Sequence, residues 1–359
     1  MMAPSTKYTR STGHFWPMRL VHIPTIGLGL LLLFTSPASL SGQGDWDLGF
    51  TAGMANYMGD IGDGVTSRRD FIWDMQEFRT RPAFGLYARR KLDRDGLWHV
   101  RADISRIHIS GSDEDTQYAP RRARNLHFRN HMTEGAIRLE RDLLQKPLVW
   151  ARQRRAMLTV RGFIGYARLQ HNPEARIDIN NLMYGQLVSD GITRPGQWHS
   201  LPELQTGGVD YSNELNITTI PFGVSAIITG QKRGGAADFY VGIELGFRMT
   251  DTDYLDDITG FYADPSEMTQ LGAALSSQAN PIDLNLAGPG AGSMTAHSYI
   301  GDEIPVIRGN PANDDAYGTL VVTYGKVLNG RSQSFNRSRS TYGNKRGGGL
   351  FRKSTKMKF

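Results

Sequence analysis

The stretch Asp238-Phe-Tyr-Val-Gly-Ile-Glu-Leu-Gly-Phe-Arg-Met-Thr250 decides the fold. Phe239, Ile243 and Phe247 fall on one face, whereas Glu244 and Arg248 fall on the other. Strict alternation of apolar and polar residues predicts a β-strand with one apolar face. The stretch is longer than the 5–6 residues typical of soluble strands. It suits the 9–11 residues that a tilted strand needs to cross a membrane.

Seven other segments alternate in the same way, so the chain is predicted to form eight antiparallel strands. In a soluble sandwich the apolar faces would form the core, whereas in a membrane barrel they would face lipid and the polar faces would line the lumen. An eight-stranded barrel is narrow enough for side chains to fill it, and opposite charges inside would have to pair. The seven segments are Asp45–Asn56, Arg81–Leu92, Leu97–Ser110, Asn130–Arg141, Ala156–Leu169, Asn216–Thr229 and Ala316–Val327. The candidate lumen charge network is Arg101, Asp103, Glu134, Arg138, Glu244 and Arg248.

The connections alternate in length, which favours the barrel over the sandwich. Long loops on one side, short turns on the other and an even number of strands are typical of outer-membrane barrels. The sequence therefore predicts an all-β, eight-stranded antiparallel transmembrane β-barrel with long extracellular loops and short periplasmic turns. The long connections are Tyr57–Thr80, Gly111–Arg129, Gln170–Leu215 and Asp251–Asp315, and the short ones are Asp93–Gly96, Asp142–Arg155 and Gly230–Ala237.

The composition agrees with this class. The 359 residues include no cysteine, which excludes disulfides, thiolate metal sites and cysteine nucleophiles. The mean hydropathy of −0.39 argues against a helical membrane bundle but not against a barrel, whose strands are apolar only at alternate residues.

The two ends of the chain differ from the middle. Residues 1–42 show a basic start, the apolar run Ile26–Phe34 and small residues after it, which is typical of a signal peptide. An uncleaved membrane anchor is the alternative. The barrel is expected over residues 43–327. Residues 328–359 are rich in Ser, Gly, Lys and Arg and are expected to form a disordered basic periplasmic tail.

The formal net charge of +6 comes from these ends, because the intervening body is acidic. Basic residues are therefore expected on the periplasmic side, where a partner could be bound. The tail could contact anionic inner-leaflet lipid, peptidoglycan or an acidic protein face, or it could stay unbound. The candidate contact residues in the short turns and the tail are Lys146, Arg152, Arg154, Arg155, Lys232, Arg233, Arg331, Arg337 and Arg339.

Two residue groups resemble metal sites. The carboxylates Asp251, Asp253, Asp256 and Asp257 could bind Ca²⁺, but they lack the spacing of a calcium loop. A solvated loop with internal turn hydrogen bonds is the favoured interpretation. The pair His127 and His131, four residues apart, lies at a strand start rather than on a helix, so isolated loop or lumen histidines are expected.

A hydrolase at the outer rim would need a nucleophile and a base. His171 and His199 with Ser200 are the available residues, but they form no recognisable motif. We therefore expect no enzymatic activity and no cofactor or metal.

Five stretches together resemble the PorG-like outer-membrane barrel subunit of the Bacteroidota type IX secretion system. The resemblance implies a non-catalytic barrel that anchors the periplasmic ring of the secretion machine, with the ring lipoprotein and its partner subunit as protein partners. Outer-membrane lipid is expected as a further partner, and neither nucleic acid nor a small-molecule substrate is expected. The alternatives are a channel or adhesin barrel and a rim hydrolase. The stretches are Asn56–Gly62, Arg81–Tyr87, Arg124–Arg129, Thr250–Asp257 and Arg308–Asp315.

Overall fold

The computed structural model describes seven parts of the chain. The predicted signal segment and all of the predicted tail except Leu328 lie outside these residues, as do parts of several connections. The described residues are 46–62, 75–93, 96–151, 154–231, 237–278, 308–311 and 314–328.

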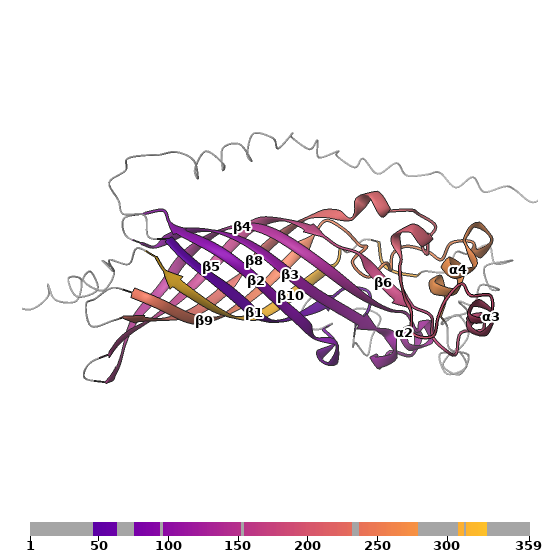
Figure 1. Cartoon of the computed structure of the whole chain (residues 1–359), viewed down its shortest axis with the longest axis horizontal. Coiled ribbons are helices and arrows are strands. Elements are labelled where there is room, and N and C mark those ends of the chain that lie inside the picture. Colours follow the sequence, from indigo (N-terminus) through magenta and orange to yellow (C-terminus); the bar gives the residue numbers. More distant parts are fainter. Residues whose placement is uncertain are drawn as a thin grey trace, which may run out of the picture. The chain divides into compact units, whose positions relative to one another are not determined.

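Eight strands close into an antiparallel barrel, which confirms the predicted fold class (Figure 1). Strands that follow one another around the barrel pair side by side, and β1 pairs with β10 to close it. The eight strands are β1 (Trp46–Met58), β2 (Arg81–Lys91), β3 (Trp98–Ser112), β4 (His127–Ala151), β5 (Arg154–Gln170), β8 (Asn216–Gln231), β9 (Ala237–Thr250) and β10 (Ala316–Val327).

The long connections carry the remaining elements, which gather at one end of the barrel (Figure 1). Two short strands that the alternation did not predict, β6 (Pro173–Arg176) and β7 (Trp198–Ser200), extend the sheet beyond β4. No helix in the described ranges is long and apolar enough to cross a membrane. The helices are α2 (Ala119–Arg124), α3 (Tyr184–Ser189) and α4 (Gln270–Ser276), and the 3-10 turns are η2 (Glu77–Arg79), η3 (Asp113–Asp115), η4 (Pro202–Leu204), η5 (Ser212–Glu214) and η6 (Pro265–Glu267).

The outer surface of the barrel is apolar over the middle of every strand. Leu86 on β2 is 64 % exposed and Ile243 on β9 is 57 % exposed. A continuous apolar belt of this size is unfavourable in water and suits the hydrocarbon of a bilayer. Trp46 and Trp98, at the short-turn end of the belt, lie beneath the guanidiniums of Arg90 and Arg141, at 5.5 and 5.0 Å from the ring centroids. This is the amphipathic arrangement expected at a membrane interface.

One predicted turn is wrong. The connection Asp142–Arg155 is mostly strand, because β4 continues to Ala151 and β5 begins at Arg154. The register shifts between Asp142 and Leu144, and this bulge breaks the period-2 pattern on which the prediction rested. Pro147, which usually marks a strand end, is accommodated within β4 opposite Met157.

The half of the barrel interior nearer the long loops is an apolar core. Side chains from the strands meet side chains from the long connections, so the loops act as a plug. Tyr57 and Phe128 pack edge to face at 4.8 Å between ring centroids. Other members of this core are Ile61, Ile107, Ile109, Leu126, Met132, Leu169, Ile217, Leu255, Ile258 and Tyr317.

An arginine on the outer face should disturb the barrel according to its depth. Ile243→Arg, at mid-strand, is expected to reduce the free energy of unfolding in vesicles by about 2–4 kcal/mol. Met249→Arg, near the strand end, is expected to reduce it by only ~0–1 kcal/mol. Denaturant titration in lipid vesicles, with folding followed by heat-dependent gel mobility, measures both. Equal costs at the two positions would contradict the assignment of the belt to the bilayer.

Candidate functional site

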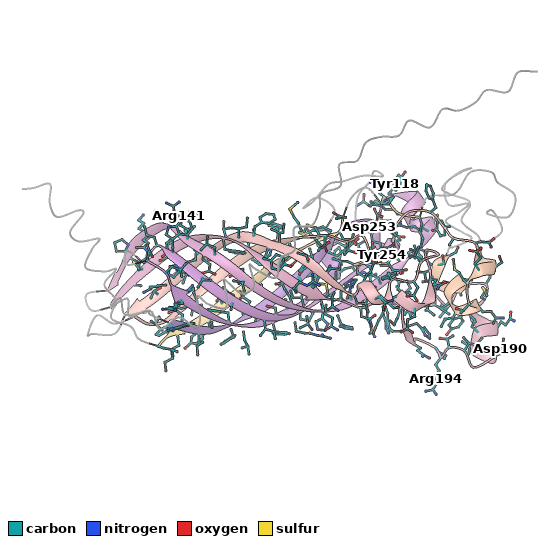
Figure 2. All side chains as sticks on the ribbon, turned by 90° about the horizontal axis from the view of Figure 1, so that it is seen from above. Tyr118, Arg141, Asp190, Arg194, Asp253 and Tyr254 are labelled. Atoms are coloured by element: carbon teal, nitrogen blue, oxygen red, sulfur yellow. The ribbon has the colours of Figure 1, made fainter. Side chains whose placement is uncertain are left out.

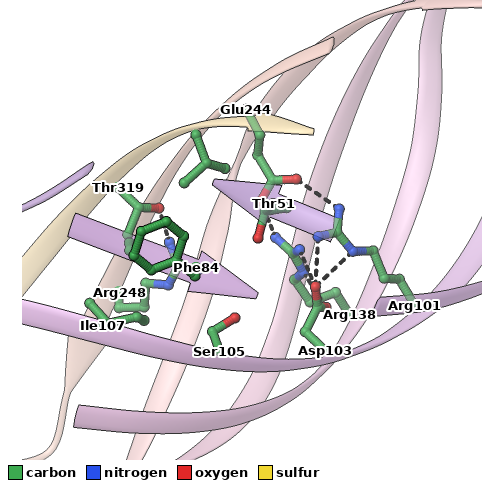
Figure 3. A pocket seen from close by; sticks show the side chains of 12 residues that line it. Thr51, Phe84, Arg101, Asp103, Ser105, Ile107, Arg138, Glu244, Arg248 and Thr319 are labelled. Carbon is green, nitrogen blue, oxygen red and sulfur yellow. Dashed lines mark hydrogen bonds and ion pairs between the residues drawn. The ribbon is translucent and has the colours of Figure 1, made fainter. Parts of the chain in front are cut away.

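The lumen contains an ion-pair network centred on Arg101 and Arg138 (Figure 3). Arg101 Nη1 donates to Glu244 Oε2 at 2.8 Å, and its Nη2 lies 2.6 Å from Asp103 Oδ1. Arg138 Nη1 donates to Glu244 Oε1 at 2.6 Å, and its Nε donates to Asp103 Oδ2 at 2.9 Å. Each arginine therefore bridges the same two carboxylates across the barrel. Charge-assisted contacts of this kind offset the cost of removing the charges from water.

The network continues toward the short-turn end. Arg89 Nε donates to Asp47 Oδ2 at 2.8 Å, joining β2 to β1. Arg161 on β5 contacts Asp142 Oδ1 at 2.5 Å and Glu140 Oε2 at 3.1 Å, both on β4. These five side chains are nearly inaccessible to solvent.

Toward the long loops the network ends at Arg248 and Glu134. The closest ion-pair distance between them is 3.3 Å, and Tyr317 Oη donates to Glu134 Oε2 at 2.7 Å. Arg248 Nη1 also donates to the Thr319 hydroxyl. This layer lies against the apolar core, to which Tyr317 itself belongs.

Aromatic rings fill the space between the ion pairs. The guanidinium of Arg101 lies 3.7 Å from the centroid of the Tyr87 ring, and that of Arg138 lies 4.5 Å from the Phe163 ring. Tyr87 and Tyr240 share a hydrogen bond of 2.8 Å. Gly49 makes room for Tyr87, because a Cβ at that position would overlap the phenol oxygen.

The lumen is consequently filled. The cavity beside Thr51, Arg101, Arg138 and Glu244 measures about 20 Å³, which is room for about one water molecule. With this network on one side and the apolar core on the other, side chains of the described residues fill the interior, as the width of an eight-stranded barrel allows.

All six residues of the predicted lumen network lie on the inner face and are joined by ion pairs. Five further charged partners were not in the predicted set. Each occupies an inward-facing position in the alternating pattern of its strand. Extending that pattern toward the strand ends would have found them. They are Asp47, Arg89, Glu140, Asp142 and Arg161.

A second cluster, the loop-end junction, lies where the long connections meet the barrel. Tyr57 Oη is 2.6 Å from Asp256 Oδ2 and 2.5 Å from Asp315 Oδ1, and it accepts a bond from the Asp60 amide at 3.0 Å. The phenol has only one proton to donate. The second short contact therefore needs a protonated carboxyl that donates to the phenol oxygen.

The expectation of a solvated acidic loop is wrong for three of its four aspartates, because Asp253, Asp256 and Asp257 are buried and only Asp251 is exposed. Burial, reinforced by neighbouring carboxylates, raises the pKa of Asp253 and of Asp256 to about 8. The same causes raise the pKa of Asp315. The sequence pattern missed this because the loops that cover the cluster are distant in the chain. Within the described residues no group of three or more potential ligands is arranged to hold a metal ion.

Two arginines tie the loop-end junction together. Arg308 Nη2 lies 2.9 Å from Asp257 Oδ2, while Arg124 Nη1 donates to the Arg308 carbonyl at 2.7 Å. Arg124 Nη2 also donates to the Asp60 carbonyl at 3.1 Å. Four of the five stretches that carry the family resemblance thus contribute directly to this one junction.

The histidines do not form the sites that their spacing suggested. His131 is not in the lumen, because it faces outward and its Nδ1 lies 2.6 Å from Nδ1 of His108. His171 is buried beside Asn130. Ser200 Oγ donates to Asn172 Oδ1, and His199 Nε2 bonds the Thr193 hydroxyl, so the hydrogen bonds of this part of the chain do not couple a base to Ser200.

The predicted periplasmic contacts are only partly within the described residues. Lys146 is exposed on β4. Arg154 and Arg155 belong to β5, but their side chains are outside the description. The remaining candidates lie outside the described residues altogether: Arg152, Lys232, Arg233, Arg331, Arg337 and Arg339.

Solved structures similar to this chain include two crystal structures of Ail, the attachment invasion locus protein of Yersinia pestis. The structure in complex with the heparin analogue sucrose octasulfate is 7% identical, covers 79% of this chain and 97% of that chain, and has a TM-score of 0.28. The other is 8% identical, covers 80% of this chain and 99% of that chain, and has a TM-score of 0.23. No protein-family model matches the chain, and no curated protein matches it.

Removing one lumen carboxylate should strongly destabilise the barrel. Glu244→Gln leaves Arg101 and Arg138 with less compensation and should lower the free energy of unfolding by about 3–5 kcal/mol. The control Glu174→Gln removes the partly exposed partner of Arg129 and should cost below about 1 kcal/mol. Urea titration of both variants by tryptophan fluorescence tests this. A cost for Glu244→Gln no larger than the control would contradict it.

The loop-end junction should weaken as pH rises. Asp253 and Asp256 keep their protons to about pH 8 in the folded protein but lose them near pH 4 when unfolded. Their contribution is therefore complete below about pH 4 and is lost as pH rises through about 8. Protection of the Leu255 and Ile258 amides, measured by hydrogen exchange corrected for intrinsic rates, should fall over this range. Asp256→Asn should flatten the profile, and an unchanged profile in this variant would contradict the assignment.

Proposed function

We propose that this chain is a non-catalytic outer-membrane barrel that anchors the periplasmic ring of the type IX protein secretion system. The ring lipoprotein and its partner subunit would bind on the periplasmic side. Three features support this: the apolar exterior, the filled lumen and a hairpin that projects from the short-turn end. The resemblance of five stretches to the PorG-like barrel subunit names the system.

The apolar exterior of the barrel supports a position in the membrane. The separation of long and short connections to opposite ends supports an orientation in that membrane. β1 begins and β10 ends at the short-turn side of the barrel. There the Leu328 amide donates a hydrogen bond to the Trp46 carbonyl at 2.8 Å. In outer-membrane barrels this side faces the periplasm. The long loops then face the cell exterior.

The filled lumen supports a scaffold rather than a conduit. Five arginines and six carboxylates interlock across it, and the apolar core closes the other half. A conducting barrel would need a continuous polar path. The residues Arg101, Arg138, Asp103 and Glu244, which lie on three different strands, would have to separate to open one.

The β4–β5 hairpin carries the proposal. β3 pairs with β4 only as far as Arg141, whereas β4 continues to Ala151. Over Leu144–Val149, β4 pairs with β5 on one side, and none of the described strands pairs with its other edge. An unpaired edge can accept a strand from a partner protein. Lys146 is exposed on this arm, and the tip is basic in sequence, so an acidic partner segment is favoured.

Shortening this hairpin should release the ring without unfolding the barrel. Replacing residues 148–156 by Asn-Gly joins Pro147 to its partner Met157 through a two-residue turn and keeps the β5–β8 pairs from Met157 onward. We expect ring subunits to co-purify with the parent chain but not with this variant, and the variant to keep its heat-dependent gel mobility.

Charge reversal supplies the matched control. Lys146→Glu should reduce the recovery of ring subunits, whereas Arg194→Glu, on an exposed loop at the opposite end (Figure 2), should not. Full recovery with the shortened hairpin would contradict the anchor site. Intact protein secretion in cells without the chain would contradict the anchor function.

A further inference from the structure

We propose that the outer face of β3, β4 and β5 binds a phosphate of a phosphorylated glycolipid, lipid A, from the outer leaflet of the membrane. The site is centred on Gly135, between Arg106 and Arg168, and is called here the Gly135 notch. The inference rests on the proposed outer-membrane position and orientation, but not on the ring partner.

The Gly135 notch is a gap in an otherwise covered surface. Gly135 faces outward on β4, and a Cβ there would meet no atom within 4 Å. Its neighbours in the register are Ile104 on β3 and Arg168 on β5. The next outward pair toward the long loops is Arg106 with Thr133. Bare backbone is therefore flanked by an apolar side chain, a hydroxyl and two guanidiniums.

The notch lies at the upper boundary of the apolar belt. Ile104 and Ile164 are 60 % and 57 % exposed, whereas Arg106 is the first outward charge beyond Ile104 on β3. Arg168 follows Tyr166 in the same way on β5. Barrel strands tilt by about 35–45°, so a level boundary crosses the rows of paired residues obliquely. Both arginines thus border the belt at the level of lipid head groups, with apolar surface below for acyl chains.

The two arginines have free binding capacity. Arg106 Nη1 donates to Thr133 Oγ1 at 2.6 Å, and Arg168 donates to Thr218 Oγ1 at 2.9 Å and to the Asn216 carbonyl at 3.0 Å. Neither forms an ion pair with another residue in the described part of the chain. A guanidinium held only by neutral acceptors keeps its charge and further N–H groups for an anion, and its planar geometry matches a phosphate.

The nearby acidic groups are already engaged. Glu174 pairs with Arg129 at 2.6 Å, and Asp251 Oδ1 accepts the Thr218 amide at 2.9 Å. The outward residue paired with Arg168 on β8 is the neutral Thr218. The positive charge is therefore concentrated over β3–β5, which favours one bound lipid over a general attraction to the membrane surface.

Native mass spectrometry of the full chain in detergent micelles tests the proposal. The probes are diphosphoryl lipid A, its dephosphorylated form and phosphatidylglycerol. We expect the parent chain to retain one molecule of diphosphoryl lipid A, and Arg106→Gln with Arg168→Gln to bind it about tenfold or more weakly. Arg141→Gln, an exposed arginine at the opposite rim (Figure 2), should bind it like the parent.

A second variant keeps both charges. Gly135→Leu fills the notch and should also weaken binding about tenfold, with heat-dependent mobility confirming that the barrel is folded. Unchanged binding in the double arginine variant or in Gly135→Leu would overturn the proposal. Equal binding of the dephosphorylated lipid, or of phosphatidylglycerol, would overturn it as well. Recovery of ring subunits by the same variants is expected to stay at the parent level, so the two proposals fail independently.

Discussion

Five arginine guanidiniums lie inside the barrel almost inaccessible to solvent, and each must therefore be neutralised by a carboxylate on another strand. This constraint determines much of the interior. Arg101 and Arg138 share Asp103 and Glu244, so β3, β4 and β9 are coupled across the lumen rather than only through the sheet. Removing one member leaves its partners buried without compensation, and that cost exceeds the energy of any single pair.

The interior of the barrel is also divided into two halves that are stabilised by different interactions. Ion pairs fill the half near the short turns, and apolar side chains fill the half near the long loops, with Glu134, Arg248 and Tyr317 at the boundary. Because Leu255 and Ile258 of a long connection belong to the apolar half, the loops are held to the strands by burial. The loop-end junction adds buried carboxyls that stabilise this arrangement while they are protonated.

The strand alternation was sufficient to predict the eight strands, their inward and outward faces and the centre of the lumen network. Alternation did not predict features that depend on strand irregularities or on contacts between residues distant in the sequence. The bulge after Asp142 and the proline at 147 hid the end of β4. The burial of Asp256 could not be predicted, because the residues that cover it come from β1 and from the segment before β10. The pairing of His108 with His131 depends on strand register, which alternation alone does not fix.

Both proposals place the functional surfaces on the outside of an internally bonded barrel, at the protruding hairpin at one end and on the lipid-facing strands. Single-channel recording of the purified full chain in planar lipid bilayers tests this claim most directly. The filled lumen predicts no conductance steps above the baseline of the lipid alone. Steady, reproducible steps that scale with salt concentration would show an open aqueous path and contradict it.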